Sequence, residues 1–225
     1  MLRKYLLLFH FVLITFALQA QFGINASYRI NDMPELIGTD INNPAQEENL
    51  LESGFNLGLD YWIPLSNIRI ELLPELNYGR YTRTFESQST LKAQFFNFFF
   101  NVNFYLFDLM GDCDCPTFSK QGSPLSKGFF AQISPGFSFV DTAIKETDES
   151  AGDWGFNLGA GIGMDIGLSD LITLTPMAGV RYYPNTEFAG MYLVEDGSSG
   201  GSKLDNQFDI LQWHAGLRLG FRLDQ

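Results

Sequence analysis

The chain ends in a stretch where apolar and polar residues alternate without a break. From position 211 to position 223 every second residue is apolar, and the positions between them hold Gln, His, Arg or Gly. Successive side chains of a β-strand point to opposite faces, so this period of two predicts a long strand with one apolar and one polar face. A chain built this way is constrained to fold as amphipathic strands.

Seven earlier segments show the same alternation and predict seven further strands, eight in all. They span residues 22–30, 55–63, 68–78, 96–106, 129–139, 156–166 and 172–182. No Pro-rich or Ser-rich linker separates them, so they are expected to form one domain. The expected fold class is all-β: an eight-stranded antiparallel up-and-down transmembrane β-barrel.

The alternation alone does not decide which face lies inside. A soluble lipid-carrying barrel would place the apolar face inside, and a membrane barrel would place it outside. The interior of an eight-stranded barrel is just wide enough for side chains to fill. The apolar set, rich in Phe, is too large for that interior. The sequence therefore predicts that the apolar face points to lipid.

The opposite face carries small and charged residues that suit a narrow, filled lumen. Glycines recur on the predicted strand 156–166, and charged residues recur on the others. The lumen charge network that we expect comprises Arg69, Glu71, Glu75, Asp165, Arg181, His214, Arg218 and Arg222. Filling and stiffening the barrel is favoured over gating, because continuous water passage would need a wider barrel.

The amino end has the features of a secretory signal peptide. Arg3 and Lys4 precede an apolar run over residues 5–17, and the small residue Ala20 follows it. The run is short for a membrane helix, and no later segment approaches about eighteen uncharged apolar residues. We predict cleavage after Ala20, which leaves residues 1–20 as signal peptide and 21–225 as the barrel domain.

The spacing of the predicted strands gives alternating loop lengths. The connections at 31–53, 82–93, 140–154 and 184–207 are predicted to be long, and those at 64–67 and 169–170 to be tight. Only the connection at 108–127 departs from the alternation. With both chain ends in the periplasm, the four long loops would face the cell exterior.

Those four long segments hold sixteen acidic residues against four basic ones. The whole chain carries a net charge of −12, which disfavours a nucleic-acid partner. The acidic rim is either a solvated surface or one that binds divalent cations or a basic partner. No stretch has the spacing of a calcium-binding loop, so no metal or cofactor site is predicted.

Three prolines fall inside predicted strands of a barrel that should have no edge. Pro74, Pro135 and Pro176 each remove a hydrogen-bond donor from the ladder, so bulges or local widening are expected there. In addition, the sequence GFNLG at 54–58 recurs at 155–159, each time before a tight turn and a proline-containing strand. The repeat predicts two hairpins of similar construction.

His214 is the only histidine after residue 20, so a site with several histidine ligands is excluded. It is expected to be a packed interior residue. An enzyme that modifies membrane lipids would need a serine nucleophile beside this one imidazole base, and no sequence signature provides it. No catalytic residue is predicted.

Cys113 and Cys115 stand in the 108–127 connection, in a compartment that oxidises thiols. A local disulfide or an intermolecular bridge is expected. Redox activity or metal binding is the alternative, and it is disfavoured because a C-x-C pair supplies two ligands where structural zinc takes four.

Together, the signal peptide and the eight amphipathic strands resemble the OmpA/OmpX-like and PorT-like outer-membrane barrel families of Gram-negative bacteria. The resemblance also includes the strand at 70–78 (IELLPELNY) and the last strand at 216–223 (GLRLGFRL). It implies an outer-membrane protein that contacts lipid and lipopolysaccharide and whose last strand is read by the barrel-insertion machinery. Asp224 and Gln225 follow that strand, where these families usually end on an aromatic residue.

Three functions remain open at this point. The first is a structural or interaction role at the envelope, in which acidic exterior loops contact an envelope or extracellular protein. Here the PorT-like resemblance implies an auxiliary part in secretion or envelope assembly. The second is a narrow porin-like channel, and the third is a lipid-modifying membrane enzyme. A soluble carrier barrel is a distant fourth.

Overall fold

A computed structural model describes the strands of the chain and several of the turns between them. It describes residues 21–33, 51–65, 68–84, 90–107, 128–145, 149–169, 171–188, 193–194, 204–205 and 207–222. The predicted signal peptide and both cysteines lie outside these residues. In the described part, no helix is long and apolar enough to cross a membrane.

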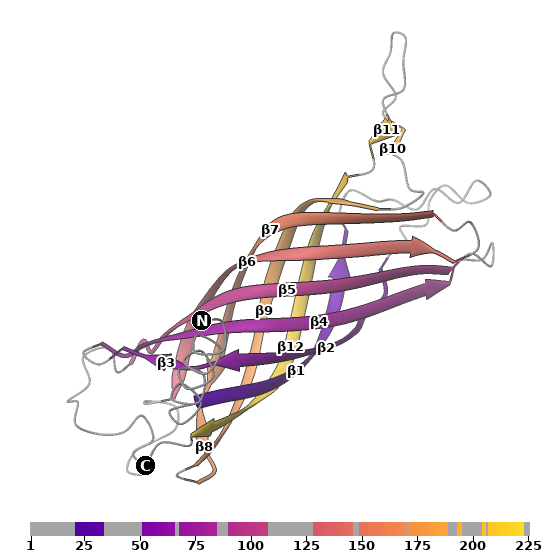
Figure 1. Ribbon diagram of the computed structural model, residues 1–225. Helices are drawn as coiled ribbons and strands as arrows, with labels where there is room; N and C mark the ends of the chain where they lie inside the picture. Colours follow the sequence, from indigo (N-terminus) through magenta and orange to yellow (C-terminus); the bar gives the residue numbers. More distant parts are fainter. Residues whose placement is uncertain are drawn as a thin grey trace, which may run out of the picture.

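Long antiparallel strands make up the fold (Figure 1). The long strands are β1 (Gln21–Asp32), β2 (Gly54–Tyr61), β4 (Ile70–Thr84), β5 (Thr90–Phe104), β6 (Phe129–Ile144), β7 (Glu149–Met164), β9 (Ile172–Glu187) and β12 (Gln207–Arg222). The short ones are β3 (Ile63–Pro64), β8 (Ile166–Gly167), β10 (Leu193–Val194) and β11 (Leu204–Asp205). The last two pair only with each other.

The long strands pair in chain order, and the first pairs with the last to close a barrel. β1 and β12 are in register from Gln21↔Arg222 to Asp32↔Leu211. β3 and β8 pair with β4 and β9 in the same register as β2 and β7, so they continue those two strands. The prediction of a closed eight-stranded antiparallel barrel is confirmed. Below, "proximal" denotes the barrel end with Gln21 and Arg222, and "distal" the end with Asp32 and Gln207.

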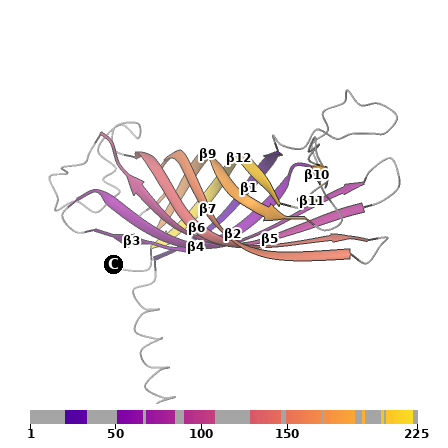
Figure 2. The same ribbon diagram turned by 90° about the horizontal axis from the view of Figure 1, so that it is seen from above.

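The strands are tilted across one another, as in other small barrels. Seen from above in Figure 2, the wall formed by β9, β12 and β1 crosses the wall formed by β4 to β7. Along β1, every second side chain is buried in the lumen and the ones between are exposed. The exposed set is apolar, with Leu57 at 62% and Phe55 at 73%, whereas the inward Arg29 is 1% exposed. The predicted apolar exterior is confirmed.

All three strand prolines interrupt the ladder on one side without a register shift. Pro74 pairs with Phe100 of β5, but on its other side the β2–β4 ladder stops at Asp60↔Glu75 and resumes at Ile63↔Leu72. The ladder beside Pro135 skips from Phe99↔Gly136 to Val102↔Ile133. The ladder beside Pro176 skips from Gly163↔Met177 to Ile166↔Leu174. Of the two expected outcomes, bulges or local widening, the described pairings show no bulge at these prolines, and the ladder is locally unpaired on one side of each.

The repeated GFNLG segments do lie on strands built alike. β2 is interrupted at Trp62 and continues as β3, while β7 is interrupted at Asp165 and continues as β8. In each break the backbone N–H turns to the other neighbour: Trp62 N donates to Gln21 O at 2.8 Å and Asp165 N to Gly128 O at 2.9 Å. The pseudo-symmetry of the two hairpins is confirmed.

Two of the predicted long loops are wrong. β4 and β5 run on to Thr84 and from Thr90, and β6 and β7 run on to Ile144 and from Glu149. The segments 82–93 and 140–154 are therefore mostly strand. Residues 33–53 and 188–206 do separate long strands, and so do residues 105–128 at the proximal end.

Candidate functional site

The lumen holds polar side chains in layers, and the most proximal layer is a carboxylate cluster. The Tyr105 hydroxyl is hydrogen-bonded to Glu71 Oε2 at 2.7 Å and to Asp165. Thr175 donates a further hydrogen bond to Asp165. Arg69 lies with its guanidinium 4.7 Å from the centre of the Tyr105 ring. Glu71 and Asp165, two of the predicted network residues, thus meet around one phenol oxygen, and a third, Arg69, lies over the ring of the same tyrosine.

The next layer is an ion pair between Arg218 of β12 and Asp60 of β2. Arg218 Nε donates to Asp60 Oδ2 at 2.8 Å, and Nη2 donates to Oδ1 at 2.5 Å. Both side chains are buried, and Gly23 of β1 lies directly beside them. A two-point guanidinium–carboxylate contact has strong directional preference. It therefore fixes the spacing of β2 and β12 across β1.

In the middle of the lumen, Arg181 of β9 reaches toward Glu75 of β4. Nη2 lies 3.5 Å from Glu75 Oε2, and the guanidinium stacks 3.5 Å from the centre of the Phe99 ring. Asn101 and Asn77 donate to the two Glu75 oxygens at 2.6 Å and 3.1 Å. Arg181 is 4% exposed, and its Nε and Nη1 atoms have no hydrogen-bond partner among the residues that the structure describes. The contact with the Phe99 ring helps to stabilise the buried Arg181 charge, in addition to the ion pair with Glu75.

Above that layer, Arg29 of β1 is the most buried arginine described. Its guanidinium donates to Asn77 at 3.0 Å, to Gln212 at 2.9 Å and to the Tyr183 hydroxyl at 3.2 Å. Gln212 in turn donates to Asn31 at 2.6 Å. The contacts join four strands, β1, β4, β9 and β12.

The distal part of the lumen is apolar, which the sequence analysis did not anticipate. Phe95 stands at its centre, edge-on to Tyr81 at 5.2 Å and to Tyr183 at 5.5 Å between ring centres. The cluster, called the distal plug below, consists of Met33, Leu51, Tyr81, Leu91, Ala93, Phe95, Phe99, Val140, Tyr183, Phe188, Phe208 and Ile210. The expectation of a polar filling is wrong at this end of the barrel.

Little empty space remains between these layers. One cavity lined by Asn25, Asp60, Glu75 and Arg218 has a volume of about 10 Å³, and another beside Trp62 and Thr173 is as small. A cavity of this size holds about one water molecule. The larger hollow, about 590 Å³, lies on the lipid-facing wall around Ala160, Ala178 and Ala215, between larger flanking side chains. The described side chains thus fill the lumen at these layers.

His214 and Arg222 stand apart from the other predicted network residues. His214 faces the lumen at 8% exposure, packed against Gly179, and no side chain in the described ranges forms a hydrogen bond with its Nδ1 atom. No serine in the described chain is hydrogen-bonded to it, so a nucleophile–base pair is not formed there. Arg222 ends β12, and its side chain lies outside the described part. The described side chains also contain no cluster of three or more His, Cys, Asp or Glu residues suited to a metal.

Arg29 and Asp60 are the central lumen residues that the sequence analysis missed. Both sit on the polar parity of their strands, as Asn25 and Ser27 do on β1 and Asn56 does on β2. The alternation therefore contained the signal. The alternation did not reveal which side chains these residues contact. Asp60 of β2, for example, contacts Arg218 of β12, and these two strands are not neighbours in the sheet.

The comparisons with known proteins bear on the fold only. No protein-family model matches the chain, and no curated protein matches it.

Solved structures with a similar arrangement of strands are outer-membrane proteins of low identity. Neisserial surface protein A is 14% identical with a TM-score of 0.44, over 90% of this chain and 97% of that one. Ail of Yersinia pestis, bound to the heparin analogue sucrose octasulfate, is 11% identical with a TM-score of 0.48, over 90% and 97%. A major outer membrane protein of Thermus thermophilus is 12% identical with a TM-score of 0.42, over 90% and 99%.

Proposed function

We propose that the protein is an exported outer-membrane barrel that does not conduct solutes and that holds an interaction surface at the cell exterior. The filled lumen is the observation that carries this proposal. Polar layers around Arg218, Arg181 and Arg29 fill the proximal and middle lumen, and the distal plug fills its distal part. Such a lumen does not form a channel. A porin-like role would need a wider lumen.

The apolar outer wall supports the membrane location. About ten residues of tilted strand cross a bilayer, whereas β4 to β7 have 15 or 16 residues each. The excess length projects beyond the membrane at the distal end. Partner proteins bind to this projecting sheet. The binding serves surface attachment, envelope assembly or an auxiliary step of secretion.

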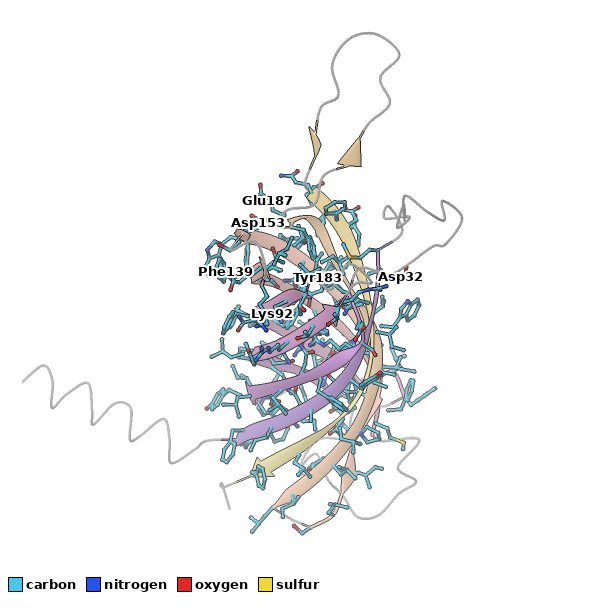
Figure 3. The ribbon with its side chains drawn as sticks, turned by 90° about the vertical axis from the view of Figure 1, so that its right-hand side faces the viewer. Asp32, Lys92, Phe139, Asp153, Tyr183 and Glu187 are labelled. Carbon is cyan, nitrogen blue, oxygen red and sulfur yellow. The ribbon has the colours of Figure 1, made fainter. Side chains whose placement is uncertain are left out.

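Charge at the distal end supports a protein partner over direct contact with lipid phosphates. Asp32, Asp153 and Glu187 are all at that end in Figure 3, together with Lys92. Acidic side chains repel phosphate unless a divalent cation bridges them, and they attract basic protein segments. The proposed partner is therefore an envelope or extracellular protein with a basic surface.

Two measurements test the proposal. Purified barrel in planar bilayers should give no stepwise current, with a wide porin as positive control in the same bilayers, and a regular open level would overturn the closed-lumen role. Orientation is tested in a background without native cysteines (Cys113→Ser, Cys115→Ser). Asp32→Cys should react with an impermeant maleimide on intact cells, while Ser169→Cys at the proximal turn should react only after lysis. The reverse pattern would refute the exterior assignment.

A further inference from the structure

Two carboxyl groups of the proximal lumen share one phenol. Tyr105 Oη lies 2.7 Å from Glu71 Oε2 and is also hydrogen-bonded to Asp165 Oδ2. Glu71 belongs to β4, whereas Asp165 lies in the break between β7 and β8, so the phenol connects two parts of the barrel wall. A phenol hydroxyl has one proton to donate, and an ionised carboxylate only accepts hydrogen bonds. If both carboxyl groups were ionised, one of the two contacts would hold two oxygen atoms together without a proton between them.

Other carboxylates of the lumen have donors of their own. Asp60 receives Arg218 Nε and Nη2 on its two oxygens. Glu75 receives Asn77 on one oxygen and Asn101 on the other, at 3.1 Å and 2.6 Å. A carboxylate that accepts hydrogen bonds on both oxygens is stabilised in its ionised form. These two side chains are therefore ionised at neutral pH.

Glu71 has fewer donors than Asp165. Asp165 accepts a hydrogen bond from Thr175 on Oδ1, in addition to the contact of its Oδ2 with Tyr105. The Trp62 indole contacts the carboxyl group of Glu71, but Glu71 Oε1 is buried and has no partner in hydrogen-bond geometry among the described residues. A protonated carboxyl group has an O–H to donate, so the missing proton of the Tyr105 contact belongs on Glu71.

The charges around the phenol point to the same count of protons. Among the described side chains of this layer, Arg218 and Arg69 face the carboxyl groups of Asp60, Glu71 and Asp165. Arg218 is held by Asp60, and the Arg69 guanidinium lies over the Tyr105 ring. The nearby Glu75 has Arg181 beside it. The other strands bring uncharged side chains to the adjoining cavity: Asn25 from β1, Asn103 from β5, Gln132 from β6 and Thr175 from β9. Two positive charges thus face three carboxyl groups, and one bound proton makes this layer neutral.

We propose that the proximal lumen is a proton-binding site, in which Glu71 holds one proton at neutral pH and donates it to Tyr105, while Tyr105 donates its own proton to Asp165. The hydrogen bonds then run in one direction, from Glu71 Oε2 through Tyr105 Oη to Asp165 Oδ2. A solvated Glu in the unfolded chain is ionised at neutral pH, so the barrel takes up this proton as it folds. Loss of the proton in alkali leaves two anions against one phenol and weakens the connection between β4 and the β7–β8 break. The site does not depend on the proposed exterior role.

Infrared spectroscopy of the full barrel in detergent micelles tests the proposal directly. At neutral pH the wild-type protein should show the carbonyl stretch of a protonated carboxylic acid. Glu71→Gln should lose this band, because its amide N–H donates to Tyr105 in place of the acid. Glu75→Gln is the matched control and should keep the band. Absence of the band from the wild-type protein, or its survival in Glu71→Gln, would overturn the proposal.

Asp165→Asn tests whether the proton is held because two carboxyl groups share the phenol. In this variant Tyr105 can donate to an ionised Glu71 and accept from the amide of position 165, so the acid band should again disappear. A band that persists would mean that burial alone protonates Glu71, and the shared arrangement would be refuted.

The pH dependence of unfolding counts the proton independently. Because the folded state binds one proton more than the unfolded state, stability should fall as the pH rises from the ordinary titration range of Glu to neutral pH. The folding equilibrium constant of the wild-type protein, divided by that of Glu71→Gln, should fall about tenfold for each pH unit. The ratio isolates Glu71, since both proteins share every other titrating group. Glu75→Gln should follow the wild-type dependence near neutral pH, and a constant ratio between wild type and Glu71→Gln would show that no proton is bound.

Discussion

Arg218 and Asp60 form a two-point ion pair across the interior of the barrel, with Nη2 2.5 Å from Oδ1 and Nε 2.8 Å from Oδ2. The two residues are 158 positions apart and come from strands that do not touch in the sheet. Their contact bridges the lumen behind β1. This ion pair connects β2 and β12 inside the proximal half of the barrel and stabilises their arrangement.

Removing one partner of this pair leaves the other charge buried and unpaired. Asp60→Ala should lower the free energy of unfolding by about 3–5 kcal/mol. Urea unfolding in detergent micelles measures the change, with Asp32→Ala as control. Asp32 is exposed at the distal end, so its loss should stay within about 0.5 kcal/mol. Equal values for both variants would contradict a bracing role.

Two glycines offer a matched test of lumen packing. A Cβ on Gly23 would lie 2.5 Å from Arg218 Nε and 2.6 Å from Asp60 Oδ1, whereas a Cβ on Gly155 would meet nothing nearer than 4.0 Å. Gly23→Ala should therefore displace the ion pair and destabilise the barrel by about 1–3 kcal/mol. Gly155→Ala should be close to neutral. Heat-dependent gel migration of the two variants compares them, and a transition as low for Gly155→Ala as for Gly23→Ala would contradict this explanation.

The distal plug should contribute more to stability than aromatic residues of the outer wall. Phe95 is fully buried, and Phe98 three positions on is 44% exposed. Phe95→Ala should cost about 3–5 kcal/mol, because it leaves a cavity among Tyr81 and Tyr183. Phe98→Ala, measured in the same micelles, should cost clearly less. A reversed order would mean that Phe95 faces lipid.

The pairing of β9 with β12 shifts register between Phe208 and Ile210, where Pro184 and Asn185 oppose the single residue Asp209. This bulge in β9 should depend on the residue at position 185. Its φ of 49° is tolerated by Asn and Gly and strained for β-branched residues. Asn185→Val should destabilise the barrel by about 1–2 kcal/mol. Asn185→Gly should change the free energy of unfolding by a few tenths of a kcal/mol at most, which is about the size of the effect of most surface substitutions. Equal stability of the Val and Gly variants would show that the bulge is absent in membranes.

The strands and their faces followed from alternation because lipid and lumen impose opposite demands on successive residues. Leu57 and Phe98 point outward and Arg29 and Glu75 inward, as their parities require. The run FFNFFF at 95–100 places Phe on both faces of its strand. Phe95 and Phe99 share the inward parity of Asn97, but the lumen was expected to be polar throughout, and the distal plug was therefore missed.

Strand ends were predicted less well than strand cores. Residues 82–84 and 149–153 are polar or small, as loop residues usually are, but each segment lies opposite a continuing neighbour strand. Hydrogen bonds between hairpin partners extend such strands beyond the apolar belt. Long-range pairs such as Arg218 with Asp60 depend on the closure of the barrel between β1 and β12. The local sequence does not specify which side chains this closure brings together.

The closing contact of the barrel joins the two ends of its strand sequence, since β1 pairs with β12 along its whole length. None of those twelve pairings can form until the last strand has been synthesised and delivered. Until β12 is in place, the outward apolar side chains of the strands are not covered by a bilayer. The sheet then also has two unpaired edges. Contacts of such high sequence separation make folding slow and leave the chain open to aggregation. For the exported outer-membrane barrel proposed above, this means that the polypeptide must be kept unfolded between its translocation and its insertion.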